Sequence, residues 1–177
     1  PRDNGIGDIV HQPSNSTILG AAKITGKLKS GTSIGFLTAL TQREYAQNYD
    51  RDTDSTYETQ IEPMTFYSVT RVEQQFGKER STVGFSLTAV GRDLNDVARL
   101  EERLRKSAMT GGADWRLKFK QGLYELYGHT GFSHIRGSRH AIVRAQRSSA
   151  RYFQRPDADY IEFDSTRTAL TGYSSGL

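Results

Sequence analysis

Hydrophobic and polar residues alternate one by one along several stretches of the chain. In 81–91, Val83, Phe85 and Leu87 fall on one face of an extended backbone, and small polar residues and glycine fall on the other. A period of two is typical of a β-strand, whose successive side chains lie on opposite faces. The pattern is mixed in 64–76 and weaker in 161–174. It predicts strands over 18–28, 32–42, 64–76, 81–91, 108–120, 123–134 and 161–174.

The connections between these strands alternate in length. Short ones are expected at 29–31, 77–80 and 121–122, and long polar ones at 43–61, 92–107 and 135–160. An up-and-down transmembrane barrel has this arrangement, with short periplasmic turns and long outer loops, although regular hairpins also occur in soluble sheets. The strands reach or slightly exceed the roughly 9–11 residues needed to cross a membrane, whereas strands of soluble proteins usually have about 5–6.

These patterns predict an all-β fold. The expected architecture is an antiparallel up-and-down transmembrane β-barrel, of which this chain forms a part with about seven strands. Residues 1–16 show no period and are expected to form an N-terminal loop, and 17–177 the partial outer-membrane barrel. Aromatic residues near the expected strand ends, such as Phe76, Phe119 and Tyr124, fit the interfacial girdles of such a barrel.

Two of the long loops contain a helical pattern. In 93–106, apolar residues recur at helical spacing at Val97, Leu100 and Leu104, with Asp93 or Asn95 as candidate N-caps. In 138–151, the same spacing joins Ala141, Ile142, Ala145 and Ser149, and Ser138 is the candidate cap. We therefore expect a short amphipathic helix in each loop, packed on the barrel rim or folded into its mouth.

The composition excludes some classes of protein, but it does not distinguish a soluble domain from a transmembrane barrel. With 35% apolar and 25% charged residues and a mean hydropathy of -0.64, the chain resembles both soluble domains and barrels. No run of about 20 apolar residues is present, so a membrane-spanning helix is excluded. The chain lacks cysteine, which excludes thiolate metal sites and cysteine nucleophiles. A net charge of +4, with arginines scattered among acidic residues, does not predict a nucleic-acid partner.

Candidate binding residues lie on the polar strand faces and in the last long loop. Asp114 and Arg116 would line the barrel lumen. The loop contributes Arg147, Arg151, Tyr152, Arg155 and Asp157. Guanidinium groups beside aromatic rings suit a carboxylate, a phosphate or a sugar, and they suit an internal ion-pair network equally well.

We expect the arginine-rich loop, 144–159, to fold inward over the barrel mouth. Its four arginines repel one another unless each finds a carboxylate or a carbonyl. The expected carboxylate partners are Asp157, Asp159, Glu73, Asp114 and Glu125.

No catalytic, metal or cofactor site is predicted. His129 and His134 fall on opposite strand faces, and no carboxylate recurs at ligand spacing. The chain has no phosphate-binding glycine loop, no G-x-S-x-G elbow and no H-E-x-x-H helix.

Three stretches resemble an uncharacterised family of bacterial outer-membrane proteins. They are ILGAAKITGKLKSGTSIGFLTALTQRE (18–44), STVGFSLTAVGRDLND (81–96) and AQRSSARYFQRPDAD (145–159). Full-length members carry an N-terminal carbohydrate-binding-like β-sandwich before a large barrel, and the resemblance implies that this chain is the early part of that barrel. It also implies a bacterial outer-membrane location, contact with lipid, and a saccharide or small solute as ligand. Seven strands alone do not make a typical bacterial barrel, because such barrels have an even number of strands.

The expected function is therefore a segment of an outer-membrane β-barrel that serves as a scaffold or a solute passage, linked to saccharide handling. Two alternatives remain open from the sequence. One is a soluble carbohydrate-binding β-domain. The other is a membrane-associated hydrolase, since some members of the resembling family carry that label.

Overall fold

The computed structural model describes residues 8–95, 97–157 and 159–177, which form an antiparallel all-β structure with short helices. The strands are β1 (Asp8–His11), β2 (Ile18–Lys27), β3 (Thr32–Thr41), β4 (Glu44–Asp50), β5 (Ser55–Glu62), β6 (Thr65–Phe76), β7 (Ser81–Arg92), β8 (Arg105–Phe119), β9 (Tyr124–Gly137) and β10 (Ala169–Gly176). The helices are α1 (Ala98–Arg103), the 3-10 turn η1 (Lys120–Gly122) and α2 (Arg139–Arg147).

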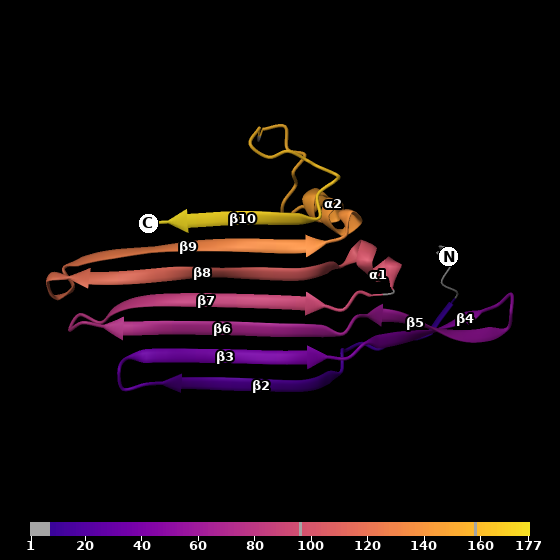
Figure 1. Ribbon diagram of the computed structural model, residues 1–177, viewed down its shortest axis with the longest axis horizontal. Helices are drawn as coiled ribbons and strands as arrows, with labels where there is room; N and C mark the ends of the chain where they lie inside the picture. The colour runs from indigo at the N-terminus through magenta and orange to yellow at the C-terminus, as the bar shows by residue number, and fades with distance from the viewer. Residues whose placement is uncertain (1–7, 96, 158) are drawn as a thin grey trace.

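Seven strands form one large antiparallel sheet in the order β10-β9-β8-β7-β6-β3-β2 (Figure 1). Strands that follow one another in this order also follow one another along the chain, apart from the excursion through β4 and β5. All seven strands predicted from the alternating pattern have a counterpart, but the last one begins at Ala169, so the expected strand over 161–168 is wrong. The sheet is open, with β2 at one edge and β10 at the other.

The connections are sorted by length between the two ends of the sheet. The short ones, between β2 and β3, β6 and β7, and β8 and β9, lie at one end in Figure 1. Both α-helices and the β4–β5 excursion lie at the other end. This sorting confirms the predicted up-and-down topology of the sheet.

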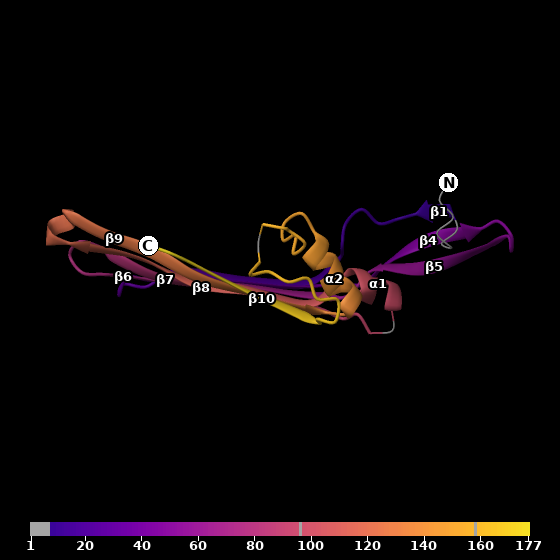
Figure 2. The same ribbon diagram turned by 90° about the horizontal axis from the view of Figure 1, so that it is seen from above.

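The strand register places apolar side chains on one face of the sheet. Ile34 pairs with Val72, Val72 with Phe85, and Phe85 with Ala113, so one row crosses four strands. The predicted band formed by Val83, Phe85, Leu87, Trp115, Leu117, Phe119, Tyr124 and Leu126 lies on this face. Phe85 remains 46% exposed and Ile24 63% exposed. Within the described residues no second sheet covers this apolar face, and Figure 2 shows the large sheet edge-on as a single layer.

The opposite face carries most of the charged strand residues and is called the polar face below. By strand alternation it holds Lys23, Lys27, Arg71, Glu73, Asp114, Arg116, Lys118, Glu125 and His129. Figure 2 shows α2 and the segment that follows it on one side of the sheet. The core residues of α2 contact Ile135 and Leu170, which share the polar face, so that side is the polar one.

Two expected loops contain strands. Within 1–16, β1 is a strand, and the expected loop 43–61 is largely the hairpin of β4 and β5, which forms a separate three-stranded sheet in the order β1-β4-β5. Both faces of β4 carry polar side chains, including a fully buried Asn48, so the segment has no hydrophobic alternation. Pro63 has no N–H to donate to a strand ladder, and it separates β5 from β6.

Both predicted helices are present at the end with long connections. The N-cap of α1 is Val97, which makes no side-chain capping bond, so the expected Asp93 or Asn95 cap is wrong. Asp93 instead pairs with Arg43 and accepts a hydrogen bond from the backbone of Asn95. Neither α-helix in the described part of the chain has the length and apolar character needed to cross a membrane.

Ser138 caps α2 as predicted, and it also joins the two α-helices. Its Oγ accepts from the backbone N–H of Ala141 at 3.2 Å and donates to the carbonyl of Glu101 at 2.8 Å. The apolar stripe of α2 is buried, with Ile142 and Ala145 packed against Ile135 and Leu170. This small core fixes the helix to the end of β9 and β10.

Replacing Ser138 with alanine should loosen α2, because it removes the cap and the bond to α1. The expected cost is about 1 kcal/mol, which is about a fivefold increase in local opening. Limited trypsin cleavage after Arg144 and Arg147 would measure this opening. Ser149→Ala, at an exposed position beyond the helix, is the control. Equal cleavage of both variants would show that the cap does not stabilise the helix.

Candidate functional site

The segment 148–168 returns from α2 to β10, and the side chain of Gln146 holds it to the helix. Gln146 is fully buried. Its Nε2 donates to the carbonyl of Asp164 at 2.8 Å, and its Oε1 accepts from the N–H of Asp164 at 2.9 Å. The carbonyl of Gln146 also accepts from the N–H of Phe153 at 2.9 Å. One residue of α2 therefore fixes both the start and the end of the returning segment.

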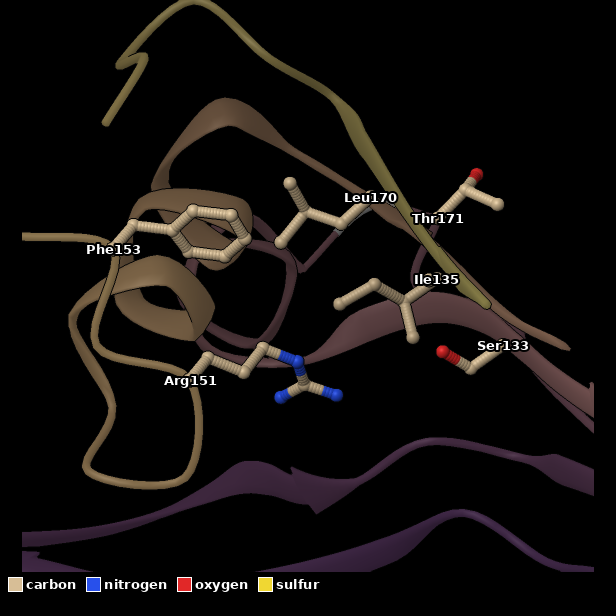
Figure 3. Close-up of a pocket in the computed structure, with 7 residues that line it drawn as sticks. Ser133, Ile135, Arg151, Phe153, Leu170 and Thr171 are labelled. Carbon is tan, nitrogen blue, oxygen red and sulfur yellow. The ribbon is translucent and has the colours of Figure 1, made fainter. Parts of the chain in front are cut away.

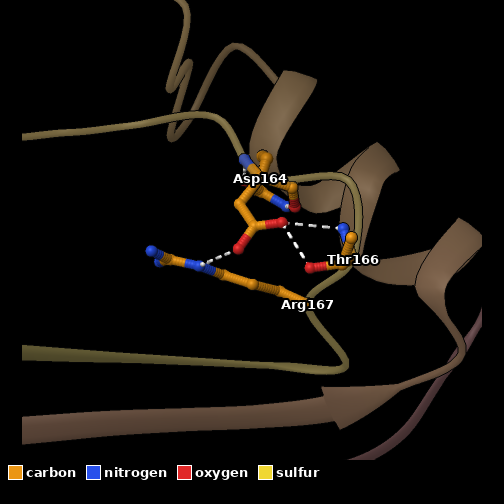
Figure 4. A network of polar contacts seen from close by, with 4 residues as sticks. Asp164, Thr166 and Arg167 are labelled. Atoms are coloured by element: carbon orange, nitrogen blue, oxygen red, sulfur yellow. Dashed lines mark hydrogen bonds and ion pairs between the residues drawn. The ribbon is translucent and has the colours of Figure 1, made fainter.

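The carboxylate of Asp164 organises the last turn before β10 (Figure 4). It accepts from the hydroxyl of Thr166 at 2.6 Å and from its N–H at 2.8 Å, and Nε of Arg167 lies 3.3 Å away. These contacts, led by the Thr166 hydroxyl, lower the pKa of the Asp164 carboxyl below its ordinary value of 3.8. The turn is thus held by an ionised aspartate.

A pocket of about 190 Å³ lies between this segment and the polar face. It is lined by Ser133, Ile135, Arg151, Phe153, Leu170, Thr171 and Gly172. In Figure 3 the guanidinium of Arg151 extends beneath Ile135 toward Ser133, while Phe153 and Leu170 form the far wall. Arg151 and Phe153 of the arginine-rich loop therefore lie against the polar face of β9 and β10, whereas Figure 1 shows part of the returning segment beyond the β10 edge. Its position over a barrel mouth is not defined by this open sheet.

The predicted loop residues have different surroundings, and only Arg151 lines the pocket. The guanidinium carbon of Arg147 lies 5.0 Å from the ring centroid of Phe163, in a cation–π contact. Arg155 forms the predicted pair with Asp157, with 4.0 Å between Nε and Oδ1. Tyr152 has a φ of +39° and is 47% exposed. The loop residues were correctly placed in one segment, but they do not form one site.

The polar-face carboxylates bind arginines of the strands, which corrects the prediction that they pair with the loop. Arg71 forms two hydrogen bonds with Asp114, one of them 3.0 Å from Nη2 to Oδ2, and a third of 3.1 Å with Glu73. Arg116 pairs with Glu125, with 3.4 Å between Nε and Oε1. Asp114 and Arg116 therefore lie on the polar face as expected, within separate ion pairs.

Gly84 makes the Arg71–Asp114 contact sterically feasible. Arg71 lies on β6 and Asp114 on β8, so the guanidinium crosses β7 between them. A Cβ atom on Gly84 would lie 2.3 Å from Nη2 of Arg71. A glycine on the central strand is therefore needed for an arginine on one neighbour to reach an aspartate on the other.

Apart from Arg151, the residues that line the pocket were not predicted from the sequence. Ser133, Leu170 and Phe153 come from β9, β10 and the returning segment, and no local spacing relates them. Gln146 did leave a signal, because it is an uncharged polar residue beside the apolar stripe of α2. In the described part of the chain, no group of three or more histidine, aspartate or glutamate side chains could hold a metal ion.

A family model described as a domain of unknown function (DUF5916) matches residues 2–155. No curated protein and no solved structure matches the chain.

Gly84→Ala should break the contact between Arg71 and Asp114, because the new Cβ would occupy the position of the guanidinium. The free energy of unfolding should fall by about 1 kcal/mol, since both side chains are partly exposed. Gly91→Ala is the matched control on the same strand, because no atom lies within 4 Å of its new Cβ. Urea unfolding measures both variants. A similar change in the two would contradict the proposed role of Gly84.

The turn held by Asp164 should weaken in acid. Its folded-state pKa is lowered, so its contribution is present above the unfolded pKa and is lost as the pH falls through the folded one. At pH 7, Asp164→Asn should unfold at a lower urea concentration than the native chain, and the difference should shrink below pH 3.8. Asp157→Asn, at a position whose side chain is 78% exposed, is the control. A pH-independent difference for Asp164→Asn would exclude this role.

Proposed function

The chain belongs to the family of the domain of unknown function DUF5916, and we propose that it forms part of a bacterial outer-membrane β-barrel. One observation carries the proposal. A seven-stranded antiparallel meander presents a continuous apolar face that nothing in the described residues covers, while its other face is charged. In transmembrane barrels the apolar residues face lipid and the polar residues face the lumen. Soluble monomers rarely expose contiguous apolar patches above a few hundred Å².

Strand length supports a membrane-crossing role. The central strands β6 and β7 have 12 residues each, and β8 and β9 have 15 and 14. A tilted strand needs about 9–11 residues to cross the hydrocarbon layer. At the end with short turns, the aromatic rings of Phe76, Phe119 and Tyr124 are 46%, 49% and 56% exposed. Aromatic residues at this height are typical of the membrane–water interface.

The two edge strands, β2 and β10, have unpaired backbone groups, so the sheet cannot cross a membrane without further strands. Every β-strand in lipid needs hydrogen-bonding neighbours on both sides, because the hydrocarbon layer offers no water to unpaired backbone groups. In the proposed barrel, β2 and β10 therefore pair with further strands. The polar face then lines the lumen, and α2 with the segment 148–168 occupies the lumen side near the outer end.

This arrangement suits a scaffold or a passage for a small solute, which we propose to be linked to saccharide handling. The charged polar face offers hydrogen-bond donors and acceptors along the direction of the strands. The docked segment narrows the space above that face. The proposed partners are outer-membrane lipid on the apolar face and a saccharide or other small solute on the polar face.

Arginine substitutions at different depths test the membrane proposal in the full-length protein. Leu87 lies near the middle of β7 on the apolar face, whereas Leu117 lies near the end of β8. Leu87→Arg should cost about 2–4 kcal/mol and Leu117→Arg about 0–1 kcal/mol, because the cost of a charge falls from the bilayer midplane to the interface. Thr88→Arg, adjacent to Leu87 and on the polar face, is the control and should change stability little.

Urea unfolding in lipid vesicles measures the three variants, and unboiled gels report whether the native chain keeps a folded barrel in detergent. A chain that stays in solution without detergent would contradict the proposal. So would equal costs for Leu87→Arg and Thr88→Arg. Either outcome would favour a soluble β-domain.

A further inference from the structure

Three arginines from separate elements are neighbours, and one of them, Arg151, lines the pocket under the returning segment. Arg92 ends β7, Arg105 begins β8, and Arg151 belongs to the segment 148–168. Nη1 of Arg92 donates to the carbonyl of Arg105 at 3.0 Å. Arg92 and Arg151 both lie within electrostatic range of the Arg105 guanidinium, which is partly buried. The three positive charges are therefore neighbours although they are far apart along the chain.

These three charges are not neutralised within the described part of the chain. None of the three arginines has a carboxylate at ion-pair distance there. Three carboxylates of the surrounding connections pair with other arginines, namely Asp93 with Arg43, Asp157 with Arg155 and Asp164 with Arg167. Neighbouring like charges repel, so an anion placed among them is stabilised.

The pocket adds shape and one hydrogen-bonding side chain to this positive charge. Arg151 extends toward Ser133, whose hydroxyl lies on the same face of the sheet (Figure 3), whereas the Thr171 hydroxyl lies on the opposite face within 2.8 Å of His134 Nδ1. Phe153, Ile135 and Leu170 supply an apolar wall opposite the guanidinium. At about 190 Å³, the space is smaller than the roughly 300–1,000 Å³ of sites for drug-sized ligands. It fits one charged group and a small adjoining part of a solute.

We propose that this pocket binds the carboxylate or phosphate group of an acidic solute, with the Arg151 guanidinium as the main contact. A guanidinium presents parallel N–H donors that match either group in a two-point hydrogen bond. Arg92 and Arg105 add positive charge near it, and the apolar wall contacts the uncharged part of the solute. The pocket opens on the face that we propose lines the lumen, so the inference rests on the proposed function and names its solute class.

Binding to the full-length protein in neutral detergent tests the inference. Glucuronate and glucose 6-phosphate are the probes, glucose is the uncharged control, and isothermal titration measures affinity. Both anions should bind, and glucose should give no measurable heat. Arg151→Gln should weaken the binding of both anions by about tenfold or more, because a hydrogen bond to a charged group is lost. Arg144→Gln, on the exposed side of α2, should bind both anions as the native chain does.

Two further measurements make the result specific. Arg151→Lys retains the charge without the planar fork, so it should bind more weakly than the native chain and more tightly than Arg151→Gln. This variant also carries the test if Arg151→Gln does not fold. Phosphatidylglycerol added to the micelles should not compete with glucuronate. Competition would assign the pocket to a lipid phosphate and overturn the proposal of a solute.

Equal affinity for glucose and glucuronate, or equal binding by the Arg151 and Arg144 variants, would overturn the inference. Unboiled gels of the same samples report the barrel independently. A gel shift without anion binding would reject the pocket and leave the proposed function standing. Anion binding that depends on Arg151, in a chain that stays soluble without detergent, would keep the pocket and reject the barrel.

Discussion

The structure depends on one constraint: seven strands are joined by backbone hydrogen bonds into a single layer whose apolar side chains share one face. Strand alternation makes this sorting unavoidable once the register is set, because a slip of one residue would exchange the two faces. A two-layered domain would bury that face against a second layer. Here Phe85 and Ile24 stay 46% and 63% exposed, so the described residues do not bury this face.

Glycines on the central strands leave room for large side chains on both faces of the sheet. On the polar face, Gly84 leaves room for Arg71 to reach across a strand to Asp114. On the apolar face, a Cβ atom on Gly128 would lie 2.7 Å from the Trp115 ring. In each case a long side chain lies flat over a neighbouring glycine. The glycines therefore shape both surfaces of the sheet in addition to its turns.

The sequence predicted those features that depend on local periodicity. Alternation located the first six strands of the large sheet, while the weaker pattern of the last placed its start at 161 instead of Ala169. The spacing of Ile142 and Ala145 behind Ser138 located α2 with its cap. The hairpin of β4 and β5 was missed because both of its faces are polar. The ion pairs of Asp114 and Glu125 were assigned to the wrong arginines, because these pairs depend on which strands are neighbours and in what register. The pocket was incomplete for the same reason, since its lining comes from separate parts of the chain.

The direction of the two edge strands restricts how the sheet can be closed. Six antiparallel pairings separate β2 from β10, and each reverses the strand direction, so the two edges run the same way, as the arrows in Figure 1 show. Joining these edges directly would create one parallel pair in an otherwise antiparallel sheet. A fully antiparallel cylinder has to place an odd number of additional strands between them, which brings the total to the even number typical of bacterial barrels. In such a cylinder, the direction of the two edge strands therefore fixes whether the number of additional strands is odd or even, whatever that number is.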